Sequence, residues 1–267
     1  MNKDFYIGYI NKLPEGIAKR IKITILILIS VFVLSGVGIA FHHQNISNSQ
    51  FELGKLTTLE GYFFSEPVAL IKVLEGKDIH GNLIFKSVPL VNYAKFGAED
   101  LIRIYEEKNK TSLHGKKLKL IGTLLYDDGK SLFELTKREE SILAVEVVSD
   151  YKLRQQIQPK IENLGIQSIK GEIIDSKCYF GAMRPGFGKT HRACAVRCIS
   201  GGIPPVLAAT NYDGAVNYFL IRGKEKQAIN KEVLPYVSEP VSLKGELVKF
   251  DDWMVLYVDP ATGIERQ

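Results

Sequence analysis

The most apolar stretch of the chain runs from Ile23 to Phe41 without a charged residue. Its length matches the roughly 20 apolar residues that an α-helix needs to cross the hydrocarbon core of a bilayer. A cleaved signal peptide also has a basic start, but its apolar core is shorter and small residues follow it. Here the run is long, and His42-His43-Gln44-Asn45 follows it. The pattern therefore predicts a retained transmembrane helix over residues 23–41, with a cleaved leader as the alternative.

The charges around this stretch predict its orientation. Lys12, Lys19, Arg20 and Lys22 precede it, whereas neutral histidines follow it. Because segments rich in Lys and Arg stay in the cytoplasm, residues 1–22 are expected there and the rest of the chain outside. In a bacterium this predicts a single-pass protein of the inner (plasma) membrane whose C-terminal domains are periplasmic or extracellular.

From about Phe51 the pattern changes to short alternating or apolar runs separated by turn residues, which is typical of β-structure. The expected strands are Thr57–Phe64, Val68–Leu74, Ile84–Val91, Leu118–Tyr126 and Ser131–Thr136. Before the fourth strand, Ala98–Glu107 has apolar residues at helical spacing and acids in its first turn, which predicts a helix. Three strands, a helix and a two-strand hairpin follow the order of an OB-like barrel. We therefore expect a first OB-like domain over residues 51–148.

Part of this pattern recurs later in the chain. Lys170–Ile174 resembles Glu60–Phe64, and Leu243–Val248 resembles Leu120–Leu125. An acidic turn and a closing strand follow each member of the second pair. The repeat predicts a second OB-like domain over residues 166–260, with Met254–Val258 as its closing strand and a helix at Lys224–Leu234. A single mixed β-sheet domain is the alternative.

The two copies differ at one loop. The first copy passes from its first to its second strand through Ser65-Glu66-Pro67 alone, whereas the second inserts residues 175–205 at this point. Residues 149–165, which are polar with a helical pattern, are the expected linker. The predicted fold is thus mainly β, with short helices, as a transmembrane helix followed by two tandem OB-like barrels. Binding chemistry is commonly carried on loops that a rigid scaffold holds, so we expect the site in the insertion.

The insertion contains all three cysteines of the protein. If the segment after His191 is helical, His191, Cys194 and Cys198 lie on one helical face, and Cys178 approaches this face from the preceding strand or loop. One imidazole and three thiolates are a complete ligand set for a four-coordinate metal ion. We expect one transition metal ion here, zinc rather than copper. An iron–sulfur cluster agrees with the number of ligands but not with their spacing.

Neighbouring residues are expected to support these ligands. Asp175 is placed to accept a hydrogen bond from the His191 ring, or to act as an occasional ligand. Cations of the insertion offset the negative charge of the thiolates: Arg184, Lys189, Arg192 and Arg197.

A disulfide is the alternative to a metal ion, because an exported domain permits one. Cys194 and Cys198 are one helical turn apart, with side chains poorly aimed at each other. A bond from Cys178 to one of them is easier and leaves a spare thiol. Buried cysteines without either role are a third interpretation.

The pattern D-x2-C-Y…H-x2-C-A-x2-C-x2-G-G-I-P-P, from Asp175 to Pro205, resembles a motif of bacterial membrane-anchored proteins with exported OB-like domains. The resemblance covers about Gly171–Leu207 well, and the anchor and the barrels in outline. It implies an exported bacterial protein with a metal or redox site.

Composition and charge narrow the functional classes. The chain of 267 residues is 45% hydrophobic and 24% charged, as globular proteins are. Its net charge of +5 lies partly beside the apolar stretch, and no recognition helix or dense Lys/Arg stripe is evident. We therefore expect no nucleic-acid partner. Since no Ser-His-Asp or paired-carboxylate arrangement is recognisable, no catalytic residue is expected and an enzyme is disfavoured.

These observations together predict a membrane-anchored, exported metal-binding protein that acts as an accessory or assembly subunit of a membrane complex. One alternative is a thiol–disulfide or cysteine-nucleophile protein, in which Cys194 or Cys198 attacks and His191 is the base. A structural scaffold with a zinc staple is the second alternative.

Overall fold

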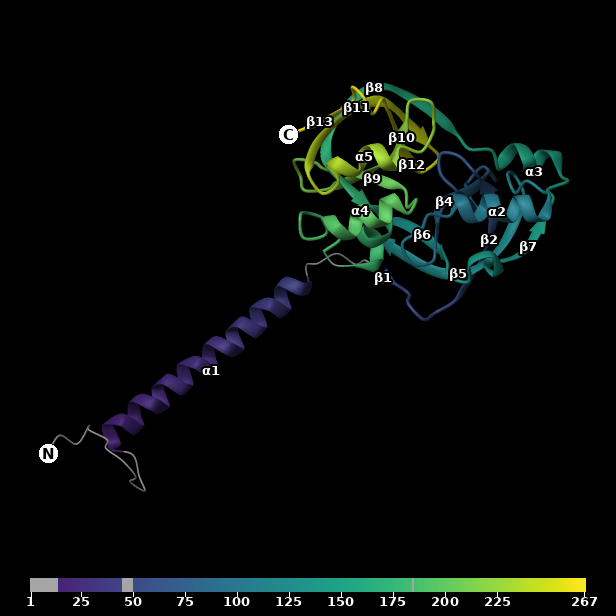
Figure 1. Ribbon diagram of the computed structural model, residues 1–267. Helices are drawn as coiled ribbons and strands as arrows, with labels where there is room; N and C mark the ends of the chain where they lie inside the picture. The colour runs from purple at the N-terminus through teal and green to yellow at the C-terminus, as the bar shows by residue number, and fades with distance from the viewer. Residues whose placement is uncertain (1–13, 45–49, 184) are drawn as a thin grey trace. The chain divides into compact units, whose positions relative to one another are not determined.

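The computed structural model of the chain describes residues 14–44, 50–183 and 185–267 (Figure 1). It divides into two units, residues 1–48 and residues 49–267. Most of the predicted cytoplasmic segment, residues 1–13, lies outside the described residues, as does Arg184 of the insertion.

The described part of the first unit is one long helix, α1 (Glu15–Gln44). Its stretch Glu15–Phe41 is 27 residues long and apolar enough to cross a membrane, and it includes the predicted span. Apolar side chains such as Leu26 and Phe32 are exposed, with none of the span buried. A helix of this length and composition is suited to lipid, because its backbone hydrogen bonds are internal.

The second unit begins with a closed barrel, which we call the first barrel. Its elements are β2 (Thr57–Phe64), β3 (Leu70–Lys77), β4 (Leu83–Asn92), α2 (Glu99–Asn109), β5 (Lys117–Asp127) and β6 (Lys130–Leu135). The sheet runs β5-β2-β3-β4-β6 and closes through β5–β6, with β4 and β6 parallel. The short strands β1 (Gln50–Phe51) and β7 (Ile142–Glu146) extend it by pairing with β5. The predicted strands and helix of this barrel are confirmed.

A second barrel follows the helix α3 (Tyr151–Gln156). Its elements are β8 (Ile161–Asp175), β9 (Pro205–Thr210), β10 (Val216–Gly223), α5 (Asn230–Val233), η3 (Leu234–Tyr236), β11 (Pro240–Phe250), β12 (Trp253–Val258) and β13 (Ile264–Arg266). The sheet runs β11-β8-β9-β10-β12 and closes through β11–β12, with β10 and β12 parallel. The strand order therefore equals that of the first barrel. The predicted class, mainly β barrels with short helices, is confirmed.

The helix of the second barrel is shorter than the predicted Lys224–Leu234. A tight turn occupies its expected first half, where Lys226 has a left-handed conformation (φ 66°) and the Gly223 N–H donates to the Gln227 carbonyl at 2.9 Å. Arg222 Nε also donates to the Lys226 carbonyl at 3.1 Å. Because these bonds use the backbone groups that a helix would need, α5 begins only at Asn230.

Matched glycines mark corresponding positions of the two barrels. A Cβ at Gly61 of β2 would collide with a backbone oxygen of β3, and one at Gly171 of β8 with a backbone oxygen of β9. In the same way, Gly122 of β5 and Gly245 of β11 each lie against the backbone of the closing strand of their barrel. At each position only glycine allows the two backbones to approach this closely. These are the glycines of the repeated sequence pattern.

Three hydrophobic clusters hold the second unit together. One fills the first barrel and one the second. The third contains residues of both barrels, among them Leu70 of the first barrel and Trp253 of the second, and also Phe180 of the insertion. The Trp253 Nε1–H donates to the Ser87 carbonyl of β4 at 2.9 Å across this junction. The barrels thus share buried apolar surface, which explains why residues 49–267 form one compact unit.

Candidate metal centre

Asp175, the last residue of β8, organises the start of the insertion. Its Oδ1 accepts hydrogen bonds from the backbone N–H groups of Lys177 at 2.9 Å and Cys178 at 3.1 Å. Such a bond from an aspartate to the backbone two or three residues later stabilises a tight turn. Cys178 then begins a π-helical turn, η2 (Cys178–Ala182). The strand end and the turn together fix the position of Cys178.

The second half of the insertion is the helix α4 (Arg192–Ser200), with His191 as its N-cap residue. Alanine and arginine favour helix, and Gly202 ends it in a left-handed conformation (φ 96°). The predicted helix after His191 is confirmed. Cys194 and Cys198 therefore lie one turn apart on the same face of α4.

Four ligand atoms of the insertion converge on one point. The three cysteine Sγ atoms and an Asp175 carboxylate oxygen all lie within 4.8 Å of one another. Cys178 and Cys198 are buried, Cys194 is half-buried, and all three are free thiols. The structure thus brings together all three predicted cysteines, with Asp175 as the fourth member.

The spacing of the sulfurs fits a single metal ion. With Zn–S bonds of about 2.3 Å, two thiolates at the corners of a tetrahedron lie roughly 3.8 Å apart. The Sγ atoms of Cys178 and Cys194 are 3.9 Å apart. An iron–sulfur cluster places several irons between its thiolates, so sulfurs on different irons lie farther apart. The geometry therefore favours a mononuclear site.

Two buried polar atoms beside the sulfurs lack a partner among the described residues. They are Asp175 Oδ2 and His191 Nε2, which lie 3.7 Å apart. Asp175 has no solvent exposure and His191 is 3% exposed, so water does not compensate for the missing hydrogen bonds. An unpartnered buried polar group costs on the order of 1–3 kcal/mol. A cation held by the carboxylate or the imidazole would remove this cost, so these residues fit a metal ion.

His191 itself lies beside the four converging atoms rather than among them. The sequence places His191 as a ligand with Asp175 behind it, whereas in the structure the Asp175 carboxylate is closer to the sulfurs. The set Cys178, His191, Cys194 and Cys198 stays a prediction, and the choice between imidazole and carboxylate defines the fourth ligand.

The electrostatics of the cluster favour an added cation. Hydrogen bonding to Cys198, burial and the Asp175 charge all raise the pKa of the Cys178 thiol. Burial acts to raise the pKa of Asp175 as well, but the neighbouring His191 imidazole and the hydrogen bond from the Cys178 backbone outweigh it and hold that pKa below its usual value. The carboxylate is thus charged, and the neighbouring thiol resists becoming a second anion. A metal ion would relieve this conflict by binding both as anions.

Two of the predicted supporting cations point elsewhere. The Arg192 guanidinium pairs with Glu239 and donates to the Pro235 carbonyl at 3.1 Å, and Arg197 is exposed. A cation that sequence analysis missed is instead in contact with a ligand, because Lys95 Nζ lies 2.9 Å from Cys194 Sγ. Lys95 belongs to the first barrel, 99 residues away in sequence. Nothing in its local sequence indicates this contact.

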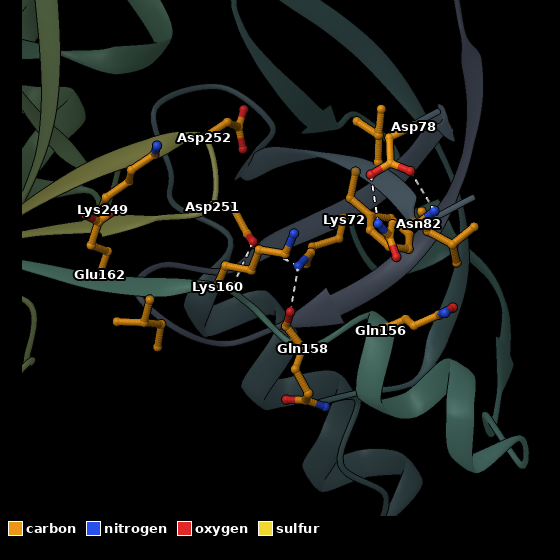
Figure 2. Close-up of a pocket in the computed structure, with 14 residues that line it drawn as sticks. Lys72, Asp78, Asn82, Gln156, Gln158, Lys160, Glu162, Lys249, Asp251 and Asp252 are labelled. Carbon is orange, nitrogen blue, oxygen red and sulfur yellow. Dashed lines mark hydrogen bonds and ion pairs between the residues drawn. The ribbon is translucent and has the colours of Figure 1, made fainter. Parts of the chain in front are cut away.

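A charged cleft lies between the barrels and holds about 500 Å³ (Figure 2). At its base, Lys72 Nζ is 2.8 Å from Asp251 Oδ2 and 3.2 Å from the Gln158 carbonyl. At its rim, Asp78 accepts hydrogen bonds from Asn82. The protein itself neutralises Lys72, which indicates a structural role for this part of the junction.

Comparisons of the chain with known protein families, with curated proteins and with solved structures find no match. The interpretation of the cluster therefore rests on its own geometry.

Proposed function

We propose that this protein is a membrane-anchored metal-binding protein that holds one transition metal ion in its insertion. Cys178, Cys194 and Cys198 supply three thiolates, and Asp175 or His191 supplies the fourth ligand. Zinc is favoured over copper, because a divalent ion neutralises more of the charge of three thiolates. The observation that carries the proposal is the convergence of three free thiols on a buried carboxylate whose Oδ2 has no partner among the described residues.

The cellular setting is part of the same proposal. The apolar helix α1 anchors the chain in a bacterial inner membrane, and the basic residues before it keep the N-terminus in the cytoplasm. Both barrels then lie outside the cytoplasm, where a bound metal protects the thiols from oxidation. A barrel without cysteines, joined to one that carries the site, suits an accessory or assembly subunit that docks on a membrane partner. OB-like barrels commonly present a binding face to a partner.

Thiol–disulfide chemistry is the second candidate. It is favoured by the 3.9 Å between Cys178 Sγ and Cys194 Sγ, which places the two free thiols in contact. It leaves the unpartnered atoms of Asp175 and His191 without an explanation, so the metal is preferred.

Elemental analysis of the full chain, purified in detergent under reducing conditions, tests the proposal. We expect one equivalent of zinc or copper, and its loss in Cys178→Ser and Cys198→Ser. His80→Ala, a change of an exposed histidine in the β3–β4 turn, is the matched control and should keep the metal. Metal-free protein with one disulfide and one titratable thiol would support the second candidate instead.

A further inference from the structure

Lys95 reaches the cysteine cluster from the first barrel. It lies in the connection between β4 and α2, residues 93–98, which we call the strap. The Lys95 side chain is exposed, and its Nζ donates to Cys194 Sγ at 2.9 Å. Cys194 is the half-buried member of the cluster, so this lysine covers the cluster on its more accessible side.

The strap is fixed to the insertion by buried interactions. Lys177, one residue before Cys178, donates to the carbonyls of Asn92 at 2.9 Å and Ala94 at 2.6 Å. The Lys177 ammonium also pairs with Glu134 of β6, and both side chains are buried. The backbone just before Lys95 is thus held by the residue that precedes Cys178.

The strap also packs directly on the end of α4. The Gly97 N–H donates to the Gly201 carbonyl at 3.0 Å. A Cβ at Gly201 would collide with the Lys95 carbonyl oxygen, and one at Gly97 with the Gly202 carbonyl oxygen. Gly97 of the strap and Gly201 at the end of α4 are therefore both needed for the strap to lie against α4. The close contact sets the distance from the Lys95 backbone to the helix that carries Cys194.

The negative charge of the proposed ligand set explains why a lysine beside it is favourable. Three thiolates and one carboxylate carry four negative charges, so a divalent ion leaves two uncompensated. An ammonium group that donates to a metal-bound sulfur spreads this charge and stabilises the thiolate. Of the predicted cations, Arg192 pairs with Glu239 and Arg197 is exposed, whereas Lys95 contacts a ligand sulfur directly.

We propose that Lys95 is a positioning residue of the metal centre, which donates to the metal-bound Cys194 thiolate, so that both barrels together build the site. This inference rests on the proposed function, because it assigns the partner of one of its ligands. It gives the first barrel a part in metal binding in addition to any docking role.

The test is the affinity of the full chain in detergent for Zn²⁺, measured by competition with a chromophoric chelator. Lys95→Met should weaken zinc binding about 10–100-fold, the usual effect of removing a hydrogen-bond partner of a ligand. Lys95→Arg, which keeps the charge and the donors, should restore most of the affinity. Lys108→Met removes an exposed lysine of the same barrel that pairs with Glu139, and it should leave the affinity unchanged.

A second variant tests whether the position of the strap matters while the charge of Lys95 is kept. Gly201→Ala should displace the Lys95 backbone and weaken zinc binding in the same direction. Zinc affinity within twofold of wild type in Lys95→Met would overturn the inference while leaving the proposed metal site intact. An equal loss in Lys95→Arg and Lys95→Met would also overturn it, because packing rather than charge would then be responsible. Wild-type protein that binds neither zinc nor copper would overturn the inference and the proposed function together.

Discussion

Cys178 and Cys194 lie side by side, with 3.9 Å between their Sγ atoms, although one belongs to a turn after β8 and the other to α4. In metal-free protein, the oxidant diamide should take two electrons from this pair, release two protons and join the sulfurs, leaving Cys198 as the titratable thiol. Zinc added beforehand should block the reaction. Peptide mapping by mass spectrometry identifies the bond, and a product in which Cys178 is still a free thiol would contradict this prediction.

The fourth ligand can be identified by a conservative change at Asp175. Asp175→Asn keeps the oxygen that caps the Cys178 turn but removes the negative charge, so zinc affinity should fall at least tenfold. X-ray absorption of the zinc-bound wild type should show three sulfurs and one oxygen. Three sulfurs and one nitrogen would instead return His191 to the ligand set predicted from the sequence.

Metal binding should stabilise both barrels rather than the insertion alone. Cys178 and Cys198 belong to the hydrophobic cluster that joins the barrels, so releasing them loosens surface that both share. At a free zinc concentration of 100 times Kd, the gain in unfolding free energy is about 2.7 kcal/mol. Hydrogen exchange followed by mass spectrometry should show faster exchange in β4–β6 as well as β8–β12 after chelation. Faster exchange in the second barrel alone would favour a local zinc staple.

The ion pair at the base of the inter-barrel cleft should matter for stability without affecting the metal. Lys72 is 2% exposed and Asp251 is 11% exposed, so Lys72→Met leaves a nearly buried carboxylate without its cation. We expect a loss of about 3 kcal/mol in unfolding free energy by urea denaturation. Lys108→Met, which breaks a pair with Glu139 in which both side chains are exposed, should cost less than about 1 kcal/mol. Equal effects of the two changes would argue against the junction as a stabilising element.

The N-terminal helix should remain on the mature protein. Expressed in a bacterium, the full chain is expected in the membrane fraction after carbonate washing, with an intact mass that includes residues 1–44. Adding a charge in the middle of the span, as in Leu28→Arg, should reduce insertion, since a charged residue there costs roughly 2.5–3.5 kcal/mol. A mature chain that begins after residue 42 would show that the segment is a cleaved leader.

Local patterns predict local elements well in this chain. Thr57–Phe64 is a strand with the predicted bounds, because alternation and β-branched residues express a preference of that segment itself. The cysteine cluster is also foreseeable, since a helical turn places Cys194 and Cys198 on one face. Such patterns do not predict two side-chain contacts that form only in the folded protein. Lys95 meets Cys194 through the packing of two barrels, and Arg192 turns to Glu239 because that carboxylate comes close only in the fold.

The hydrophobic cluster that joins the two barrels is the largest feature that the pattern of no single segment predicts. Each element predicts its own buried apolar residues, but not that three of them pack together in one cluster: Leu70, Phe180 and Trp253. Burial of this kind depends on which faces meet, and hydrophobic periodicity does not specify the partner. For the same reason, the sequence places the cysteines in an insertion but does not show that Cys178 and Cys198 are buried in the cluster that joins both barrels.

The matched glycines have a consequence for where the two barrels can differ. Gly61 and Gly171, with Gly122 and Gly245, stand where two strands touch in each barrel, and such positions tolerate no other residue. Substitution is thus barred at the points of closure, whereas the connection after the first strand of a barrel is under no such constraint. That connection is short in the first barrel, and in the second it is long enough to carry three thiols.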